Sequence, residues 1–182
     1  MLLRYFLLIV LLIPVVANSD TEPKNFNLGI GVYSLQLYEK TSEETNLYDS
    51  DRLNGVSLSA AYMLTNRIAF RGTYYSLDRG NFPDTDASGY DALVYFGNGM
   101  AMRGYKWYIG GGYFSEEWNV KTESYSFSGM QFSGGFGYNW ERYSFDMLLH
   151  ARDKGDYNNN LSEPDSEIRT AGVLSMMMSA RF

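Results

Sequence analysis

The chain has 182 residues, the size of one domain, and it contains no cysteine, so disulfides cannot supplement its core. Its net charge of −6 argues against nucleic acid as a partner, because such a partner calls for a basic surface. Aromatic residues make up 16% of the chain, with 16 Tyr, 18 Gly and only 4 Pro, a composition that favours β-strands.

The first 19 residues, MLLRYFLLIVLLIPVVANS, predict a secretory signal peptide. One basic residue, Arg4, precedes an apolar run that extends from Tyr5 to Ala17. This run of about 13 residues is shorter than the roughly 20 needed to span a bilayer, which disfavours a membrane anchor as the alternative. We therefore expect a mature domain over residues 20–182. Without Arg4 the 15 Lys and Arg become 14 against 21 Asp and Glu, a net charge of −7.

Eight segments of the mature chain alternate between apolar side chains and small or polar ones, which predicts eight strands. In the second segment, Val56, Leu58 and Tyr62 share one face, and Ser57 and Ser59 share the other. The fourth segment alternates least regularly, and no segment has a helical period. In chain order the segments are NFNLGIGVY (25–33), GVSLSAAYML (55–64), RIAFRGTYY (67–75), YDALVYF (90–96), YKWYIGGGYF (105–114), MQFSGGFGY (130–138), YSFDMLLHA (143–151) and VLSMMMSARF (173–182).

The connections between these strands alternate in length, which predicts an up-and-down meander. Short links follow the second, fourth and sixth strands, at 65–66, 97–102 and 139–141. Long polar segments follow the first, third, fifth and seventh strands, at 39–53, 78–89, 115–123 and 153–167. We expect these segments to form four acidic loops at one end, carrying Glu43, Glu44, Asp49, Asp51, Asp78, Asp84, Asp86, Glu116, Glu117, Asp153, Asp156, Glu163 and Asp165.

The two faces of the strands predict which solvent surrounds the sheet. A soluble lipocalin-type barrel has its apolar face inside, but an eight-stranded interior has no room for side chains as bulky as these. Large apolar residues facing lipid and small polar residues facing a narrow lumen suit a closed, eight-stranded antiparallel transmembrane β-barrel. Aromatic residues near the strand ends are expected to form the interfacial girdles: Tyr62, Tyr74, Tyr105, Tyr138, Trp140, Tyr143 and Phe182.

The alternation also places charged side chains in the predicted lumen. We expect them to form ion pairs that fill the lumen, because an isolated buried charge is costly. The alternative is a narrow path for ions or small solutes, although eight strands leave little room for one. The predicted lumen residues are Arg71, Asp91, Lys106, Asp146, His150, Arg152, Arg169 and Arg181.

The single histidine, His150, is the residue that could suggest an enzyme. We expect it in the lumen opposite Gln131, with Ser133 as a diagonal neighbour. Asp146 lies four strand residues away, roughly 13 Å, so no acid orients the imidazole as a catalytic triad requires. The segment DSDRLNG (49–55) lacks the spacing and distal glutamate of a calcium loop. We therefore predict no catalytic residue, no cofactor and no metal site.

The chain ends on an aromatic residue that closes an alternating run. Leu174, Met176, Met178, Ala180 and Phe182 share one face of this last segment. The run resembles the C-terminal signal of bacterial outer-membrane proteins, which the assembly machinery reads, although Ala180 is small where a larger residue is common.

Together, the signal peptide, the eight strands, the alternating connections and the terminal Phe182 resemble the small OmpA/OmpX-type barrels of the porin family of outer-membrane proteins. The resemblance implies a monomer in the outer membrane of a Gram-negative bacterium, with loops outside the cell and short turns and termini in the periplasm. Its implied partners are outer-membrane lipid, lipopolysaccharide and the assembly machinery. We favour a structural or surface-interaction role, in envelope integrity or adhesion, over a narrow channel and over a lipid A-modifying enzyme.

Overall fold

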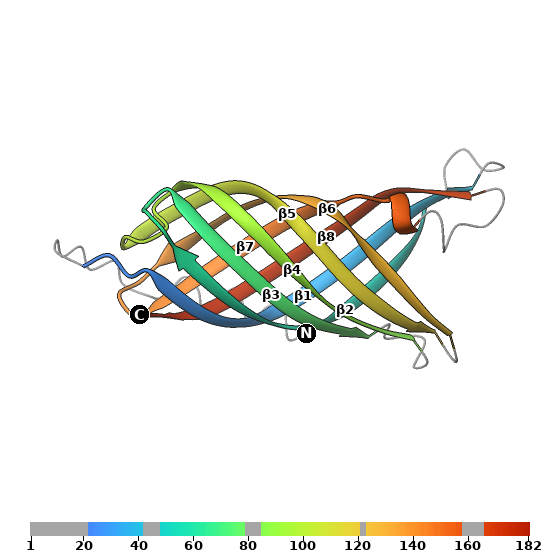
Figure 1. Cartoon of the computed structure of the whole chain (residues 1–182), viewed down its shortest axis with the longest axis horizontal. Helices are drawn as coiled ribbons and strands as arrows, with labels where there is room; N and C mark the ends of the chain where they lie inside the picture. The colour runs from blue at the N-terminus through green and yellow to red at the C-terminus, as the bar shows by residue number, and fades with distance from the viewer. Residues whose placement is uncertain (1–21, 42–47, 79–84, 121–122, 158–165) are drawn as a thin grey trace, which may run out of the picture.

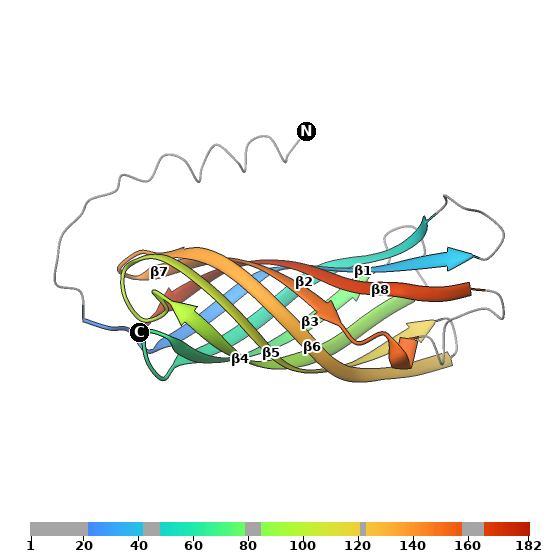
Figure 2. The same cartoon turned by 90° about the horizontal axis from the view of Figure 1, so that it is seen from above.

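The computed structural model describes residues 22–41, 48–78, 85–120, 123–157 and 166–182 (Figures 1 and 2). Eight antiparallel strands follow one another in sequence order and close into a barrel, so the predicted fold class is confirmed. The predicted signal peptide lies outside the described residues. The strands are β1 (Phe26–Thr41), β2 (Tyr48–Met63), β3 (Ile68–Asp78), β4 (Thr85–Asn98), β5 (Gly104–Val120), β6 (Glu123–Asn139), β7 (Tyr143–Arg152) and β8 (Ser166–Arg181).

The C-terminal residue lies in the seam where β8 meets β1. The backbone N–H of Phe26 donates to the carbonyl of Phe182 at 3.3 Å, and the N–H of Phe182 donates to the carbonyl of Phe26 at 2.8 Å. The two rings are also neighbours, with centroids 6.3 Å apart. The backbone of Phe182 is therefore hydrogen-bonded to β1, and such pairing keeps the last strand of a closed sheet from fraying.

The half of the barrel next to the short turns has an apolar outer surface. In β1, for example, Leu28, Ile30 and Val32 point outward and are 48%, 66% and 58% exposed. Exposing apolar surface to water costs about 25 cal/mol per Å², so a continuous surface of this kind requires a hydrocarbon environment. We call this surface the apolar band; it consists chiefly of Phe26, Leu28, Ile30, Val32, Val56, Leu58, Tyr62, Phe70, Tyr74, Tyr90, Phe96, Tyr105, Trp107, Ile109, Tyr113, Met130, Phe132, Phe136, Tyr143, Leu149, Met178 and Phe182.

Beyond the apolar band the polarity of the two faces is reversed. In β1, Leu35 and Leu37 point inward and are buried. On the outer face of the same strand, Ser34 and Gln36 lie between the apolar band and Tyr38. The interior here is an apolar cluster that surrounds the buried side chains of Glu116 and Arg152, and the wall is polar outside, as in a barrel surrounded by water. We call this part the distal half; it comprises residues 33–41, 48–55, 75–78, 85–89, 114–120, 123–129 and 166–173.

The strands therefore extend through much of the sequence predicted as loops. β5 and β6 have 17 residues each, so most of the predicted loop 115–123 belongs to strands. Most of segment 39–53 and half of segment 78–89 also lie in strands. The loop prediction was wrong because alternation continues there with polar residues outward, the reverse of the pattern in the apolar band.

A helical turn at residues 155–157 follows β7 and folds against β6. The N–H of Asp153 donates to the carbonyl of Met130 at 2.9 Å, which fixes where the chain leaves β7. In the part of the chain that the structure describes, no helix is long and apolar enough to cross a membrane.

Candidate functional site

The lumen of the barrel contains two clusters of charged and polar side chains. The first surrounds Asp146, which is fully buried. Its carboxylate accepts from Lys106 Nζ at 2.8 and 2.9 Å and from Arg71 Nη2 at 3.2 Å, and it also accepts a hydrogen bond from Tyr108. Lys106 Nζ donates further to Ser144 Oγ at 2.6 Å. These five residues form the Asp146 cluster.

Two cations share the one carboxylate in the Asp146 cluster, and aromatic rings help to accommodate the excess charge. The guanidinium of Arg71 lies 5.6 Å from the ring centroid of Tyr95 and 5.7 Å from that of Tyr108. A cation over an aromatic face is stabilised by the ring quadrupole, most strongly where water is excluded. The ring of Tyr95 packs edge-to-face on that of Tyr108 at 4.9 Å, so the two rings hold a fixed geometry around Arg71.

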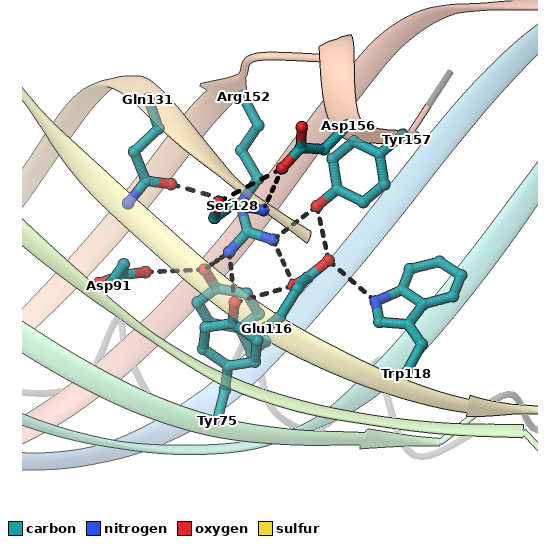
Figure 3. Close-up of polar contacts among 10 residues, drawn as sticks. Tyr75, Asp91, Glu116, Trp118, Ser128, Gln131, Arg152, Asp156 and Tyr157 are labelled. Carbon is teal, nitrogen blue, oxygen red and sulfur yellow. Dashed lines mark hydrogen bonds and ion pairs between the residues drawn. The ribbon is translucent and has the colours of Figure 1, made fainter. Parts of the chain in front are cut away.

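The second cluster surrounds the ion pair of Arg152 and Glu116, whose side chains are both fully buried (Figure 3). Arg152 Nη1 donates to Glu116 Oε2 at 2.7 Å, and Arg152 Nη2 donates to the hydroxyls of Tyr33 and Tyr75 at 2.8 and 2.9 Å. Tyr75 in turn donates to Glu116 Oε2 at 2.8 Å. The rings of Tyr33 and Tyr75 are stacked at 4.4 Å, which aligns both hydroxyls with the guanidinium.

Further donors complete this Glu116 cluster. Trp118 Nε1 donates to Glu116 Oε1 at 2.9 Å, and the hydroxyl of Tyr157 donates to the same oxygen at 2.5 Å. Arg152 Nε donates to Gln131 Oε1 at 3.3 Å (Figure 3). A buried ion pair needs such additional hydrogen bonds to offset its desolvation, and a network satisfied in this way is rigid.

Glu116 corrects one sequence prediction directly. Its place in the sequence predicts one of the four acidic loops, whereas it is 3% exposed and lies in the lumen. Because β5 continues to Val120, Glu116 falls on the same inward face as Phe114 and Trp118. Alternation therefore predicts Arg152 as a lumen cation but not Glu116, the acid that neutralises it.

Asp91 and His150 lie between the two clusters, and both are buried. Asp91 Oδ2 accepts from the hydroxyl of Tyr33 at 2.8 Å, which connects it to the Glu116 cluster. His150 pairs with Ser133, not with Gln131 as predicted, because the register of β6 and β7 is shifted by two residues from the expected one. Among the described residues, Nδ1 of His150 has no hydrogen-bond partner, so no acid orients the ring through that atom.

The remaining predicted lumen charges have different positions. Arg181 is buried, and its Nη2 donates to the carbonyl of Ala101 at 2.7 Å. Arg169 belongs to β8, but its side chain lies outside the described residues. Within the described residues, no group of three or more His, Cys, Asp or Glu side chains could hold a metal ion.

The helical turn after β7 closes the long-loop end of the lumen. Tyr157 is fully buried, and its ring stacks on those of Phe127 and Phe114 at 4.8 and 5.9 Å. Asp156 Oδ2 accepts from the N–H and the hydroxyl of Ser128 at 3.0 and 3.3 Å, which fastens the turn to β6. Burial raises the pKa of the Tyr157 hydroxyl well above its ordinary value, so the group stays protonated and donates to Glu116.

The turn between β4 and β5 closes the opposite end. Met100 and Ala101 of this turn are buried against the lumen. Asn139 Nδ2 donates to the carbonyls of Gly99 and Met100 at 2.8 and 2.9 Å, and Asn66 Oδ1 accepts from the N–H of Ala101 at 3.2 Å. Gly99 has φ of 78°, a conformation that favours glycine and lets the turn fold across the opening.

One cavity inside the described part of the barrel lies next to the Asp146 cluster. A cavity lined by Arg71, Tyr95, Lys106 and Tyr108 has a volume of about 20 Å³, room for about one water molecule. With both ends closed and two ion-pair clusters between them, the lumen is a packed interior.

The closed sheet, the apolar band and the filled interior define a membrane-spanning β-barrel. No protein-family model and no curated protein sequence matches the chain. Its fold does match solved structures of small outer-membrane barrels. Neisserial surface protein A (NspA) superposes with a TM-score of 0.59 at 13% identity, over 89% of this chain and 100% of that one.

Two further structures show the same likeness. OprG from Pseudomonas aeruginosa has a TM-score of 0.58 at 14% identity, over 90% of this chain and 98% of that one. Ail, the attachment invasion locus protein of Yersinia pestis, has a TM-score of 0.51 at 15% identity, over 88% of this chain and 100% of that one. The chain therefore has the fold of the small eight-stranded outer-membrane β-barrels.

Proposed function

We propose that this protein is a closed outer-membrane barrel whose function is to present its distal half at the cell surface. The observation that supports this proposal most directly is the combination of a filled, doubly capped lumen with strands that continue beyond the apolar band. A closed lumen leaves the outer wall and the connections of the distal half as the surfaces available to a partner.

The polar outer wall favours an aqueous location for the distal half. Asp78, Asp86 and Glu117 are exposed there, on the outer faces of β3, β4 and β5. In the proposed orientation these residues lie outside the cell, and the short turns with both ends of the mature chain lie in the periplasm. Ail is named for attachment and invasion, and by this likeness we propose a surface-interaction role, in adhesion or envelope integrity.

The proposal includes the partners and the assembly route. The barrel is a monomer surrounded by outer-membrane lipid and lipopolysaccharide, and the run that ends at Phe182 is the signal for the assembly machinery. The protein is proposed to be non-catalytic. In support, His150 is buried in the lumen, facing Ser133, with no hydrogen-bonded acid at Nδ1 among the described residues.

Single-channel recording in a planar bilayer tests the closed lumen. We expect the purified, refolded mature protein and its Arg71→Gln variant to show no discrete openings, because both ends of the lumen are capped independently of Arg71. The different gel mobility of unheated and boiled samples verifies that each protein is folded. Reproducible openings whose ion selectivity changes in Arg71→Gln would replace this proposal with a narrow channel.

A further inference from the structure

A groove crosses the outside of β2, β3 and β4 within the apolar band and continues over β1, β8 and the start of β7, where Leu28, Ile30 and Met178 also line it. Two adjoining hollows of about 1010 and 360 Å³ share the floor residues Ala60, Gly72 and Ala92. Ala60 pairs with Gly72, and Gly72 pairs with Ala92, so the floor crosses three strands directly. The walls are large apolar side chains: Leu58, Tyr74 and Tyr90 on the distal side, and Tyr62 and Phe70 on the side of the short turns.

The sheet itself does not require this groove. A Cβ added at Gly72 would meet nothing closer than the carbonyl oxygen of Asp91 at 3.9 Å, which is ordinary contact. The inward-facing Gly112 is different, since a Cβ there would lie 1.9 Å from the carbonyl oxygen of Ala92. Gly112 is needed for close packing inside the barrel, whereas Gly72 only leaves space on the outside.

The short turn that follows β2 contains a cation. Arg67 is exposed in the turn that joins β2 to β3, directly beyond Tyr62 and Phe70. Five residues separate it from Gly72, roughly 16 Å along the strand and about 13 Å along the membrane normal at the usual tilt. This is half the height of an apolar band of about 25 Å, so Arg67 lies at headgroup depth when hydrocarbon fills the groove.

We propose that this groove binds one anionic phospholipid, with its phosphate on Arg67 and an acyl chain over Ala60, Gly72 and Ala92. The groove lies inside the apolar band, so lipid acyl chains surround it. The guanidinium of arginine matches the geometry of phosphate oxygens, which favours a phosphate at Arg67. A second copy of the chain fits less well. Both copies would have the same orientation in the membrane, so two Arg67 side chains would approach each other.

Native mass spectrometry of the refolded protein in detergent, with phosphatidylglycerol or phosphatidylcholine added, tests the proposal. We expect one lipid to be retained, with phosphatidylglycerol favoured about fivefold, the usual effect of one basic residue near an anionic surface. Arg67→Gln should abolish this preference. Gly72→Leu should reduce the retention of both lipids several-fold because its side chain occupies the groove.

Two matched variants serve as controls. Gly134 forms the floor of a separate hollow of about 810 Å³ between β5 and β7, where a Cβ would have its nearest neighbour at 4.0 Å. Arg142 is exposed in another short turn, beside Glu141. Gly134→Leu and Arg142→Gln should retain lipid as the wild type does.

Three outcomes would overturn the proposal. The wild type would retain both lipids equally, Arg142→Gln would lose the preference for phosphatidylglycerol as Arg67→Gln does, or the wild type would form a dimer that Gly72→Leu dissociates. Heat-dependent gel mobility confirms that each variant is folded. If Gly72→Leu fails this check, the comparison of Arg67→Gln with Arg142→Gln decides the question alone.

Discussion

At the scale of single residues, the adjacent carboxylates of Glu116 and Glu117 lie in opposite environments, one in the lumen and one on the outer wall. Glu116 is 3% exposed and accepts from Arg152, Tyr75 and Trp118, whereas Glu117 points outward and is exposed. Consecutive strand residues face opposite sides of the sheet. A difference of one residue along the strand therefore decides whether a carboxylate lies in the lumen or in solvent.

This difference predicts unequal effects of the same substitution. Glu116→Gln leaves the buried guanidinium of Arg152 without a counter-charge, so we expect the free energy of unfolding to fall by about 3 kcal/mol. Glu117→Gln, its neighbour on the outer face, should change it by less than about 0.5 kcal/mol. Urea unfolding of both variants in the same bilayer measures the difference, and similar midpoints would show that the Glu116 cluster does not stabilise the barrel.

At the scale of the strands, the reversal of polarity is visible in the sequence as pairs of adjacent apolar residues. Val32–Tyr33, Tyr74–Tyr75 and Tyr113–Phe114 each place one side chain on the apolar band and the next in the distal interior. The eight strands and their outward face in the membrane were predictable because alternation there is regular. Three predicted strands, 25–33, 67–75 and 105–114, ended at these pairs, and the residues that follow were predicted as loops.

The sequence was sufficient to predict which side chains face the lumen, but not which residue each of them contacts there. Alternation alone placed Arg71, Lys106 and Asp146 inside, and all three are buried in one cluster. The partner of His150 depended on the geometry of the turn between β6 and β7, where a shift of two residues keeps the face and changes the neighbour.

The tryptophans test where the apolar band ends. Trp107 lies on the band and is 59% exposed, whereas Trp118 lies in the distal interior and is 3% exposed. In single-tryptophan variants made with Trp→Phe substitutions, we expect brominated phospholipid to quench the fluorescence of Trp107 several-fold more than that of Trp118. Comparable quenching of the two would mean that hydrocarbon also surrounds the distal half.

At the scale of the whole molecule, the barrel has two unlike ends. Short turns fixed by side chains such as Asn66 and Asn139 form one end, together with the paired chain terminus at Phe182. The distal half forms the other end, with its polar wall and an interior in which apolar side chains surround the Glu116 cluster. Figures 1 and 2 show the C-terminus at the end of the barrel opposite the helical turn that follows β7.

The lack of native cysteine makes the orientation of these ends directly measurable. We expect Ser126→Cys, on the outer face of β6 in the distal half, to react with a membrane-impermeant maleimide on intact cells. Arg142→Cys, in a short turn, should react only after the outer membrane is permeabilised. Both positions are exposed, so accessibility of the side chain is matched. The opposite labelling pattern would reverse the proposed orientation.

The boundary at Tyr113–Phe114 also determines which bilayer suits this barrel. On β5 the outward apolar residues run from Tyr105 to Tyr113, roughly 27 Å along the strand and about 21 Å along the barrel axis. A typical hydrocarbon core is about 30 Å thick, and a rigid barrel cannot lengthen, so the surrounding lipids must compress. Each ångström of compression costs a fraction of a kcal/mol, which favours residence in thin membranes and enrichment of short acyl chains around the protein.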